Sequence, residues 1–252
     1  MTYKIEICAN SVASCIEAQK GGAYRVELCA GIPEGGTTPS YGDIALAREL
    51  LTKTKLNVII RPRGGDFLYS DLEQKIMLKD IEMCRKLGID GVVIGCLTPD
   101  GDVDMQRNKE LVEAAGNMNI TFHRAFDMCR DPFESLENIV SLGCKILLTS
   151  GQQPKAEQGI ELLKQLVQKA DNRITIMPGS GVNETNIAKI AQETGAHEFH
   201  LSARESIESQ MTYRNPNLKM GATNVVINEF SQDITSARKV KNTLVKLQKV
   251  SH

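Results

Sequence analysis

Two of the seven cysteines in this 252-residue chain share a context that could bind a metal ion: Cys8 and Cys29 each stand two positions after a glutamate, Glu6 or Glu27. Around both cysteines, apolar residues alternate with polar ones. This alternation is typical of a β-strand, on which such a glutamate and cysteine share one face. Neighbouring parallel strands lie about 4.8 Å apart, so both sulfurs could reach one ion, and two thiolates suit Cu(I). The alternative is burial alone, because free cysteine packs as a small hydrophobe.

A second group of candidate residues lies in the segment from Arg61 to Ser70, Arg-Pro-Arg-Gly-Gly-Asp-Phe-Leu-Tyr-Ser, which follows a predicted strand. The guanidinium groups of Arg61 and Arg63 suit bidentate binding of carboxylate or phosphate, and glycines let the backbone approach an anion. We therefore expect an anionic ligand here. For one of the two arginines, an internal ion pair with Asp66 is the alternative.

Acid–base chemistry is the function suggested by His123, Arg124 and Asp127, which stand together where another strand is predicted to end. A histidine near a carboxylate can act in general acid–base catalysis, or it can orient a loop. His200 and Ser202 end a further predicted strand on the inward side. Together these residues favour a catalytic role for His123 and Asp127 if the protein is an enzyme.

Small residues follow the last three predicted strands: Ser150 after the sixth, Gly179 and Gly181 after the seventh, and Ser202 after the eighth. In many parallel barrels, backbone amides after the seventh and eighth strands bind phosphate. The glycine loop 178–182 is therefore a further candidate for binding an anion.

All these candidates need a scaffold that brings strand ends together, and the periodicity of the chain predicts one. Short β-branched runs alternate eight times with stretches of helical periodicity, and several helices end at a glycine directly before the next strand. Eight βαβ units predict an α/β fold, a (β/α)8 TIM-type barrel, with a doubly wound open sheet as the alternative. The predicted strands are 4–9, 24–29, 56–61, 90–95, 119–124, 145–149, 173–177 and 198–202. The predicted helices are 11–20, 41–51, 71–87, 104–115, 132–142, 155–169 and 184–193.

Residues 1–252 are predicted to form a single domain, because this length is typical of one such barrel. Residues 203–230 break the rhythm with Asn215-Pro216-Asn217 and Gly221, and we expect them to make a long excursion over the barrel mouth. Residues 231–250 show helical periodicity and predict a final amphipathic helix.

Charged side chains occupy the inward positions of the predicted strands. Helices must cover the apolar outer face, so alternation directs Glu6, Glu27, Arg61 and Arg63 into the barrel. Burying such groups without partners costs several kcal/mol each. They are therefore expected to form a ligand site at the carboxyl ends of the strands, where barrels place their sites, or to pair with one another in a salt-bridge network.

Overall composition excludes some partners. The 30 basic and 31 acidic residues nearly cancel, which disfavours binding to nucleic acid or to an anionic membrane. The chain shows no signal-peptide pattern and no apolar run of bilayer-spanning length. Seven cysteines without regular spacing suit a reducing compartment. We expect a cytoplasmic protein.

The motifs resemble those of the CutC family of copper homeostasis proteins. The likeness is carried, in order, by Glu27-Leu28-Cys29, Gly35-Gly36-Thr37-Thr38-Pro39-Ser40, the segment from Arg61 to Ser70, Thr121-Phe122-His123-Arg124-Ala125-Phe126-Asp127, Leu148-Thr149-Ser150-Gly151 and Tyr213-Arg214-Asn215. The resemblance implies a barrel fold, a cytoplasmic location, self-association as a homo-oligomer and a part in copper handling. The cysteines proposed to carry Cu(I) in the family match Cys8 and Cys29.

Two functional hypotheses follow from the sequence. In the first, the protein binds copper as Cu(I) through Cys8 and Cys29 without chemical turnover. In the second, it is an enzyme acting on a small anionic or phosphorylated metabolite, because Cu(I) has no use for Arg61, Arg63, His123 or Arg124.

Overall fold

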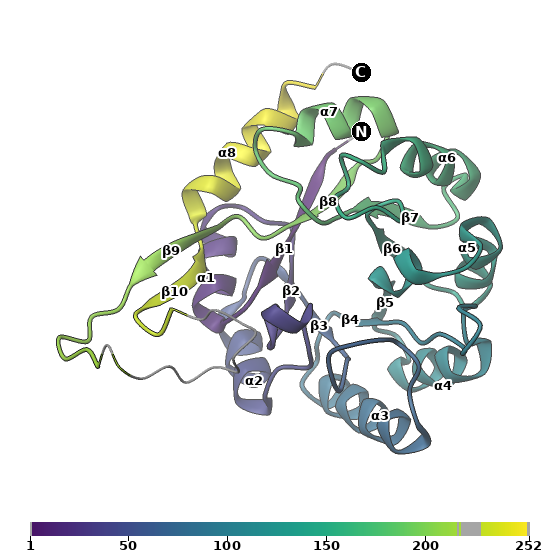
Figure 1. Ribbon diagram of the computed structural model, residues 1–252, viewed down its shortest axis with the longest axis horizontal. Helices are drawn as coiled ribbons and strands as arrows, with labels where there is room; N and C mark the ends of the chain where they lie inside the picture. The colour runs from purple at the N-terminus through teal and green to yellow at the C-terminus, as the bar shows by residue number, and fades with distance from the viewer. Residues whose placement is uncertain (1, 216, 218–227, 251–252) are drawn as a thin grey trace.

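The protein is a barrel of eight parallel strands with helices on the outside (Figure 1). A computed structural model describes residues 2–215, 217 and 228–250. The barrel strands are β1 (Lys4–Ala9), β2 (Arg25–Leu28), β3 (Lys55–Ile59), β4 (Gly91–Ile94), β5 (Asn119–Phe122), β6 (Ile146–Thr149), β7 (Thr175–Pro178) and β8 (Glu198–Leu201).

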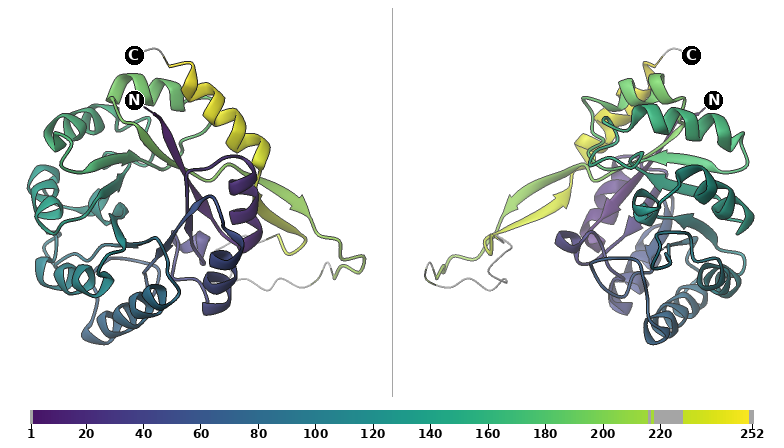
Figure 2. Two further views of the ribbon diagram at one scale, coloured as in Figure 1. Left: turned by 180° about the vertical axis from the view of Figure 1, so that it is seen from behind. Right: turned by 45° about the vertical axis from the view of Figure 1, so that its right-hand side comes forward.

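Seven helices follow the first seven strands, and an eighth packs beside them near the C-terminus (Figure 2). They are α1 (Val12–Lys20), α2 (Tyr41–Leu50), α3 (Asp71–Lys86), α4 (Met105–Ala115), α5 (Pro132–Ser141), α6 (Ile160–Ala170), α7 (Ile187–Thr194) and α8 (Ala237–Gln248). Two short 3₁₀ turns, η1 (Ile32–Glu34) and η2 (Arg124–Met128), lie in the loops after β2 and β5. Among the described residues, no helix is both long enough and apolar enough to span a bilayer.

Hydrogen-bonded pairing follows the order β7-β6-β5-β4-β3-β2-β1-β8, so the sheet curls round until its two ends meet. β7 and β8 face each other at the seam without a continuous ladder, which leaves the barrel nearly closed. The eight predicted strands and the TIM-barrel architecture are therefore confirmed, and the open sheet is excluded. Because all eight strands run in the same direction, their carboxyl ends meet at one rim.

Side-chain caps fix where the early helices begin. Ser11, Ser40, Ser70, Asp104 and Asp131 each accept a hydrogen bond from a backbone N–H in the first turn of the next helix. Such caps satisfy donors that the helix cannot use internally. The caps therefore fix the residue at which each loop ends and its helix begins.

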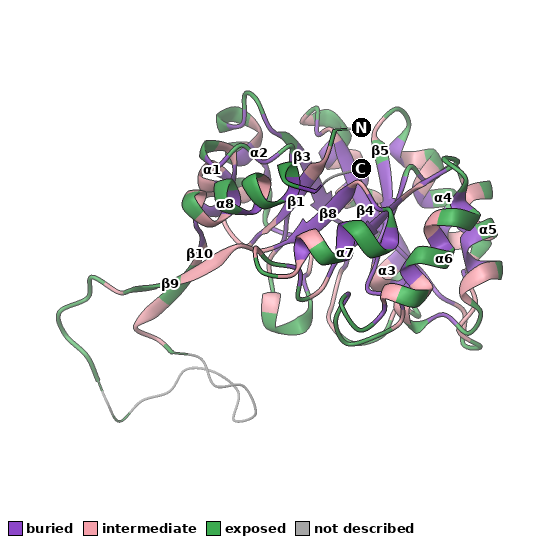
Figure 3. Cartoon of the chain, turned by 90° about the horizontal axis from the view of Figure 1, so that it is seen from above, coloured by how far each residue is buried: buried purple, intermediate pink, exposed green. Residues whose placement is uncertain are grey.

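Strand alternation separates an outer apolar face from a mixed interior. Ile5, Ile7, Val26, Leu28 and Val58 point outward into the main buried cluster that the strands share with the helices. Smaller apolar clusters lie inside the barrel, one made of Cys29, Ile59 and Val93 and another of Ile146, Leu148 and Met177. Figure 3 shows the barrel strands as the most continuously buried part of the chain. Polar side chains fill the rest of the interior.

An ion-pair network centred on Arg25 crosses this interior. The Arg25 Nε group donates to Glu6, and Arg25 Nη2 donates to Glu198 Oε2 at 2.9 Å. The side chains are 6 % exposed for Arg25, 0 % for Glu6 and 11 % for Glu198. Each charge therefore depends on its partner rather than on solvent.

The segment after β8 differs from the expectation. Within 203–230, the described residues do not cross the barrel mouth but project from the side of the barrel, as part of an antiparallel ribbon of β9 (Arg204–Glu208) and β10 (Ser231–Thr235) (Figures 1 and 3). Ala203, with φ of 47°, turns the chain away directly after β8. The remaining residues, 216 and 218–227, lie outside the described part.

Three predicted helices begin at least three residues later than expected, and one of them, 184–193, begins at Ile187. The predicted helix 231–250 is in fact β10 followed by α8, and Thr235 N of β10 donates to Ser14 Oγ at 3.1 Å on α1. The predicted helix 155–169 begins at Ile160, because Gly159 packs against the loop after β6: a Cβ at this position would lie 2.0 Å from the Ser150 carbonyl oxygen.

We predict that Arg25→Met lowers the free energy of unfolding by about 3 kcal/mol, because it removes the charge that Glu6 and Glu198 share and leaves Glu6 with His200 and Glu198 with Lys4. Urea denaturation measures this change. The matched control is Arg173→Met, which breaks an exposed pair with Glu137 and should cost less than about 1 kcal/mol. Equal costs for the two variants would contradict the account.

Candidate functional site

A cavity of about 590 Å³ opens at the carboxyl ends of the strands. This volume is typical of sites for small molecules. Of the predicted site residues, the cavity is lined by Cys8, Glu27, Cys29, Arg61, His123, Arg124, Gly181, His200 and Ser202. It is not lined by Glu6, Arg63, Asp127, Ser150 or Gly179.

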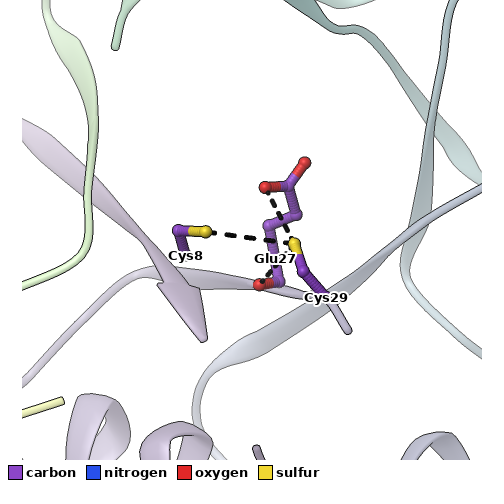
Figure 4. Close-up of side chains that lie close together, drawn as sticks. All are labelled: Cys8, Glu27 and Cys29. Atoms are coloured by element: carbon purple, nitrogen blue, oxygen red, sulfur yellow. Dashed lines mark hydrogen bonds between the residues drawn. The ribbon is translucent and has the colours of Figure 1, made fainter. Parts of the chain in front are cut away.

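Two sulfurs and a carboxylate meet on the β1 and β2 side of the cavity (Figure 4). Cys8 pairs in register with Glu27 across the two strands, and Cys29 follows directly after β2. The two Sγ atoms are 3.9 Å apart, and Cys29 Sγ lies 3.3 Å from Glu27 Oε2. One ligand atom from each of the three residues lies within 4.8 Å of the others. The strand alternation therefore places both cysteines as the sequence predicted.

His200 joins this group to the ion-pair network inside the barrel. Its Nδ1 atom lies 2.8 Å from Glu6 Oε1, and its Nε2 atom lies 3.7 Å from Glu27 Oε2. Burial raises the pKa of Glu6, but Arg25 and His200 outweigh burial and lower that pKa to about 2. Burial also disfavours the charged form of His200, but hydrogen bonds to Cys8 and Glu6 and the charge of Glu27 raise its pKa well above the usual value. These contacts favour the imidazolium form of His200.

The two thiols differ in acidity. The hydrogen bond with Cys29 lowers the pKa of Cys8, burial opposes this, and His200 lowers the pKa further, so that it falls well below its usual value. The same Cys8–Cys29 contact and burial raise the pKa of Cys29. Burial raises the pKa of Glu27 to about 8, against the attraction of His200. Cys8 is consequently the more acidic of the two thiols, and Arg204 Nη2 lies 3.4 Å from its sulfur.

Arg61 and Arg63 occupy different places. Arg61 lines the cavity, but its Nη1 and Nη2 groups donate to the carbonyl oxygens of Glu34, Gly36 and Gly65, so it ties two loops together. The expectation that Arg63 points inward is wrong: Arg63 pairs with Asp66 and with Glu73 on α3.

The predicted salt-bridge network of Glu6, Glu27, Arg61 and Arg63 does not form. Glu6 pairs instead with Arg25 and His200, and Arg61 binds backbone oxygens rather than a carboxylate. Strand alternation ends at Ile59, so it could not place Arg63. The inward charges are thus only partly matched among themselves, which leaves the cavity wall able to bind a ligand.

The candidate acid–base pair is separated. His123 lines the cavity, but burial and the nearby Arg61 lower its pKa to about 3, so its imidazole is neutral. Asp127 accepts hydrogen bonds from Arg124 Nε at 2.7 Å and from Thr149 Oγ1 at 2.5 Å, and it lies behind the cavity wall. Asp127 therefore orients loops in this structure. The catalytic role of His123 stays a prediction.

Two charged residues near the site did not emerge from the sequence: Arg25 and Glu198. Strand alternation contained the signal for both. Arg25 precedes inward Glu27 by two positions, and Glu198 precedes inward His200 by two. Arg204 stands at the base of the ribbon, beyond the end of β8, so no strand pattern could place it.

The model of the CutC family matches residues 3–205 of this chain. The chain belongs to the CutC family. Its CutC family relatives include proteins from Bacteroides fragilis and Bacteroides thetaiotaomicron, which are 62% and 61% identical over 242 residues. These alignments cover 96% of this chain and 96% and 97% of the relatives. The resemblance found in the motifs is thus confirmed.

Solved structures agree with this assignment to the CutC family. The crystal structure of CutC from Streptococcus agalactiae, which its description assigns provisionally to copper homeostasis, is 37% identical with a TM-score of 0.77. That comparison covers 80% of this chain and 99% of the other. Thiamine phosphate pyrophosphorylase from Pyrococcus furiosus has a TM-score of 0.60 at 17% identity, covering 99% and 98% of the two chains, and this likeness shows the barrel fold alone.

We predict that iodoacetamide alkylates Cys8 first at neutral pH, because the thiolate is the reactive form. Burial raises the pKa of Cys15, Cys84, Cys96 and Cys144 to about 12, so these thiols should react slowly. Peptide mass spectrometry reports the order. His200→Ala should slow labelling of Cys8, whereas His197→Ala should not. Preferential labelling of any other cysteine would overturn this assignment.

Proposed function

We propose that this protein takes part in copper homeostasis by binding Cu(I) between Cys8 and Cys29. The observation that carries the proposal is the 3.9 Å separation of the two sulfurs. Metal–thiolate bonds are about 2.3 Å long for zinc, so two bonds of that order can join these sulfurs to one ion in a bent arrangement. Soft thiolates also select Cu(I) over harder ions.

The charges around the sulfurs support the same proposal. Cu(I) held by two thiolates carries a net negative charge, which needs compensation in a buried site. His200 carries a positive charge beside Cys8, and the Arg204 guanidinium lies 3.4 Å from the Cys8 sulfur. We extend the proposal to a cytoplasmic location, where thiols stay reduced, and to the homo-oligomer that the family resemblance implies.

The copper proposal is tested by an anaerobic Cu(I) titration against a competing chelator. Wild type should bind a single equivalent. Losing a residue that only supports a metal ligand lowers metal affinity by roughly 10- to 100-fold. Because Cys8→Ser/Cys29→Ser removes the ligands themselves, its affinity for Cu(I) should fall by more than this.

Cys84→Ala/Cys144→Ala is the control, because it removes two thiols that do not line the cavity and should leave the affinity unchanged. Unchanged affinity in the Cys8/Cys29 variant would refute the proposal. Tighter binding of Zn²⁺ than of Cu(I) would also refute it, since Glu27 offers a harder third ligand.

A second candidate function rests on the size and polarity of the cavity. A volume of about 590 Å³ greatly exceeds what one ion needs, and part of its wall is formed by Arg61, Arg124, His123 and Ser202. We propose that this part of the cavity binds a small anionic metabolite, as the substrate of an enzyme. Melting temperatures measured with a panel of anions test this candidate, because a ligand that binds the folded state raises the melting temperature.

A further inference from the structure

The loops after β7 and β8 share an unusual backbone conformation at the same position. Ser180 is the second residue after β7 and has φ of 74°, and Ala203 is the second residue after β8 and has φ of 47°. Residues other than glycine rarely adopt such angles. Strain of this kind persists where the surrounding structure holds it in place, and it is frequent at ligand-binding sites.

Backbone donors are unused on both loops. The N–H groups of Ser180, Gly181 and Val182 make no hydrogen bond within the described part of the chain, and the same holds for the N–H of Ser202. All four residues line the cavity. Backbone N–H groups require acceptors, and a run of successive N–H groups in a turn is a favourable site for an anion.

Cations outnumber carboxylates in the cavity wall. Among the described residues that line it, Glu27 is the one carboxylate, whereas Arg61, Arg124 and Arg204 carry guanidinium groups. Arg124 uses Nε and Nη2, and Arg204 uses Nη2, so neither Nη1 group has a hydrogen-bond partner in the described part of the chain. The wall therefore offers both backbone amides and charged donors to an anion.

We propose that the loops after β7 and β8 bind the phosphate group of a small phosphorylated metabolite, whose remainder fills the cavity toward Cys8 and Glu27. Phosphate fits better than carboxylate because its additional oxygens can accept from amides of both loops and from a guanidinium group at once. The inference rests on the second candidate function, and its contacts to the phosphate group use no sulfur atom.

The experiment measures binding by titration calorimetry and melting temperature at constant ionic strength, with inorganic phosphate, glycerol phosphate and malonate as probes. Wild type should bind glycerol phosphate more tightly than inorganic phosphate. Ser202→Asp should weaken binding by about tenfold or more, because it sets a like charge beside the anion. Ser202→Asn, which adds no charge, should retain binding.

Asn117→Asp is the matched control, because it adds the same charge on an exposed loop at the other end of the barrel and should leave binding unchanged. If Ser202→Asp does not fold, Asn183→Asp repeats the test on the loop after β7. It is nearly isosteric and can keep the contact between its Oδ1 and Thr185 N, but it loses the hydrogen bond from Nδ2 to the Gly181 carbonyl oxygen.

Equal binding of glycerol phosphate by wild type and Ser202→Asp would overturn the inference, and so would failure of wild type to bind either phosphate probe. Equal affinity for the two phosphate probes would assign the site to free phosphate and overturn the proposal that its ligand is a phosphorylated metabolite. Binding of malonate alone would overturn the proposed phosphate site, but it would remain consistent with the second candidate function, binding of a small anionic metabolite. Retained phosphate binding by Cys8→Ser/Cys29→Ser would support the inference whatever the copper result.

Discussion

Inside the barrel, the Glu6 carboxylate is completely buried and is shared between Arg25 and His200. A buried carboxylate destabilises the folded state unless oppositely charged groups pair with it. Those groups are themselves positioned by further contacts. Arg25 is oriented by Glu198 as well as by Glu6, and His200 is oriented so that its other nitrogen faces Glu27. The positive charge of His200 at the cavity, and with it the acidity of Cys8, depends on this chain of contacts.

The cavity divides into two regions with different chemistry. Sulfur atoms and the Glu27 carboxylate lie on the side of β1 and β2, whereas free backbone amides and Arg124 lie toward the loops after β5, β7 and β8. A soft metal ion suits the first region, and the phosphate group of a metabolite suits the second. The Arg204 guanidinium adjoins both regions, because its Nη2 lies 3.4 Å from the Cys8 sulfur while its Nη1 has no partner among the described residues.

The sequence pattern predicted those features of the fold and the site that depend on local periodicity, above all the direction of side chains along a strand. Alternation along β1, β2 and β8 correctly placed Cys8, Cys29, Glu27 and His200 at one rim, because side-chain direction within a strand follows from the backbone alone. It failed for Arg63, which lies beyond the end of β3, and for the segment after β8, where a left-handed residue redirects the chain. The partners of Glu6 depend on contacts up to 194 positions apart, which no local pattern contains.

The central claim is that the buried ion pairs keep His200 positively charged beside the Cys8 sulfur. Nitrogen-15 NMR of the histidine side chains tests it most directly, with His200→Ala used to assign the signals. At about pH 7.5, well above the ordinary histidine pKa of about 6.5, both ring nitrogens of His200 should be protonated, while His123 should be neutral in the same spectrum. A neutral His200 imidazole that titrates near its ordinary pKa would contradict the account.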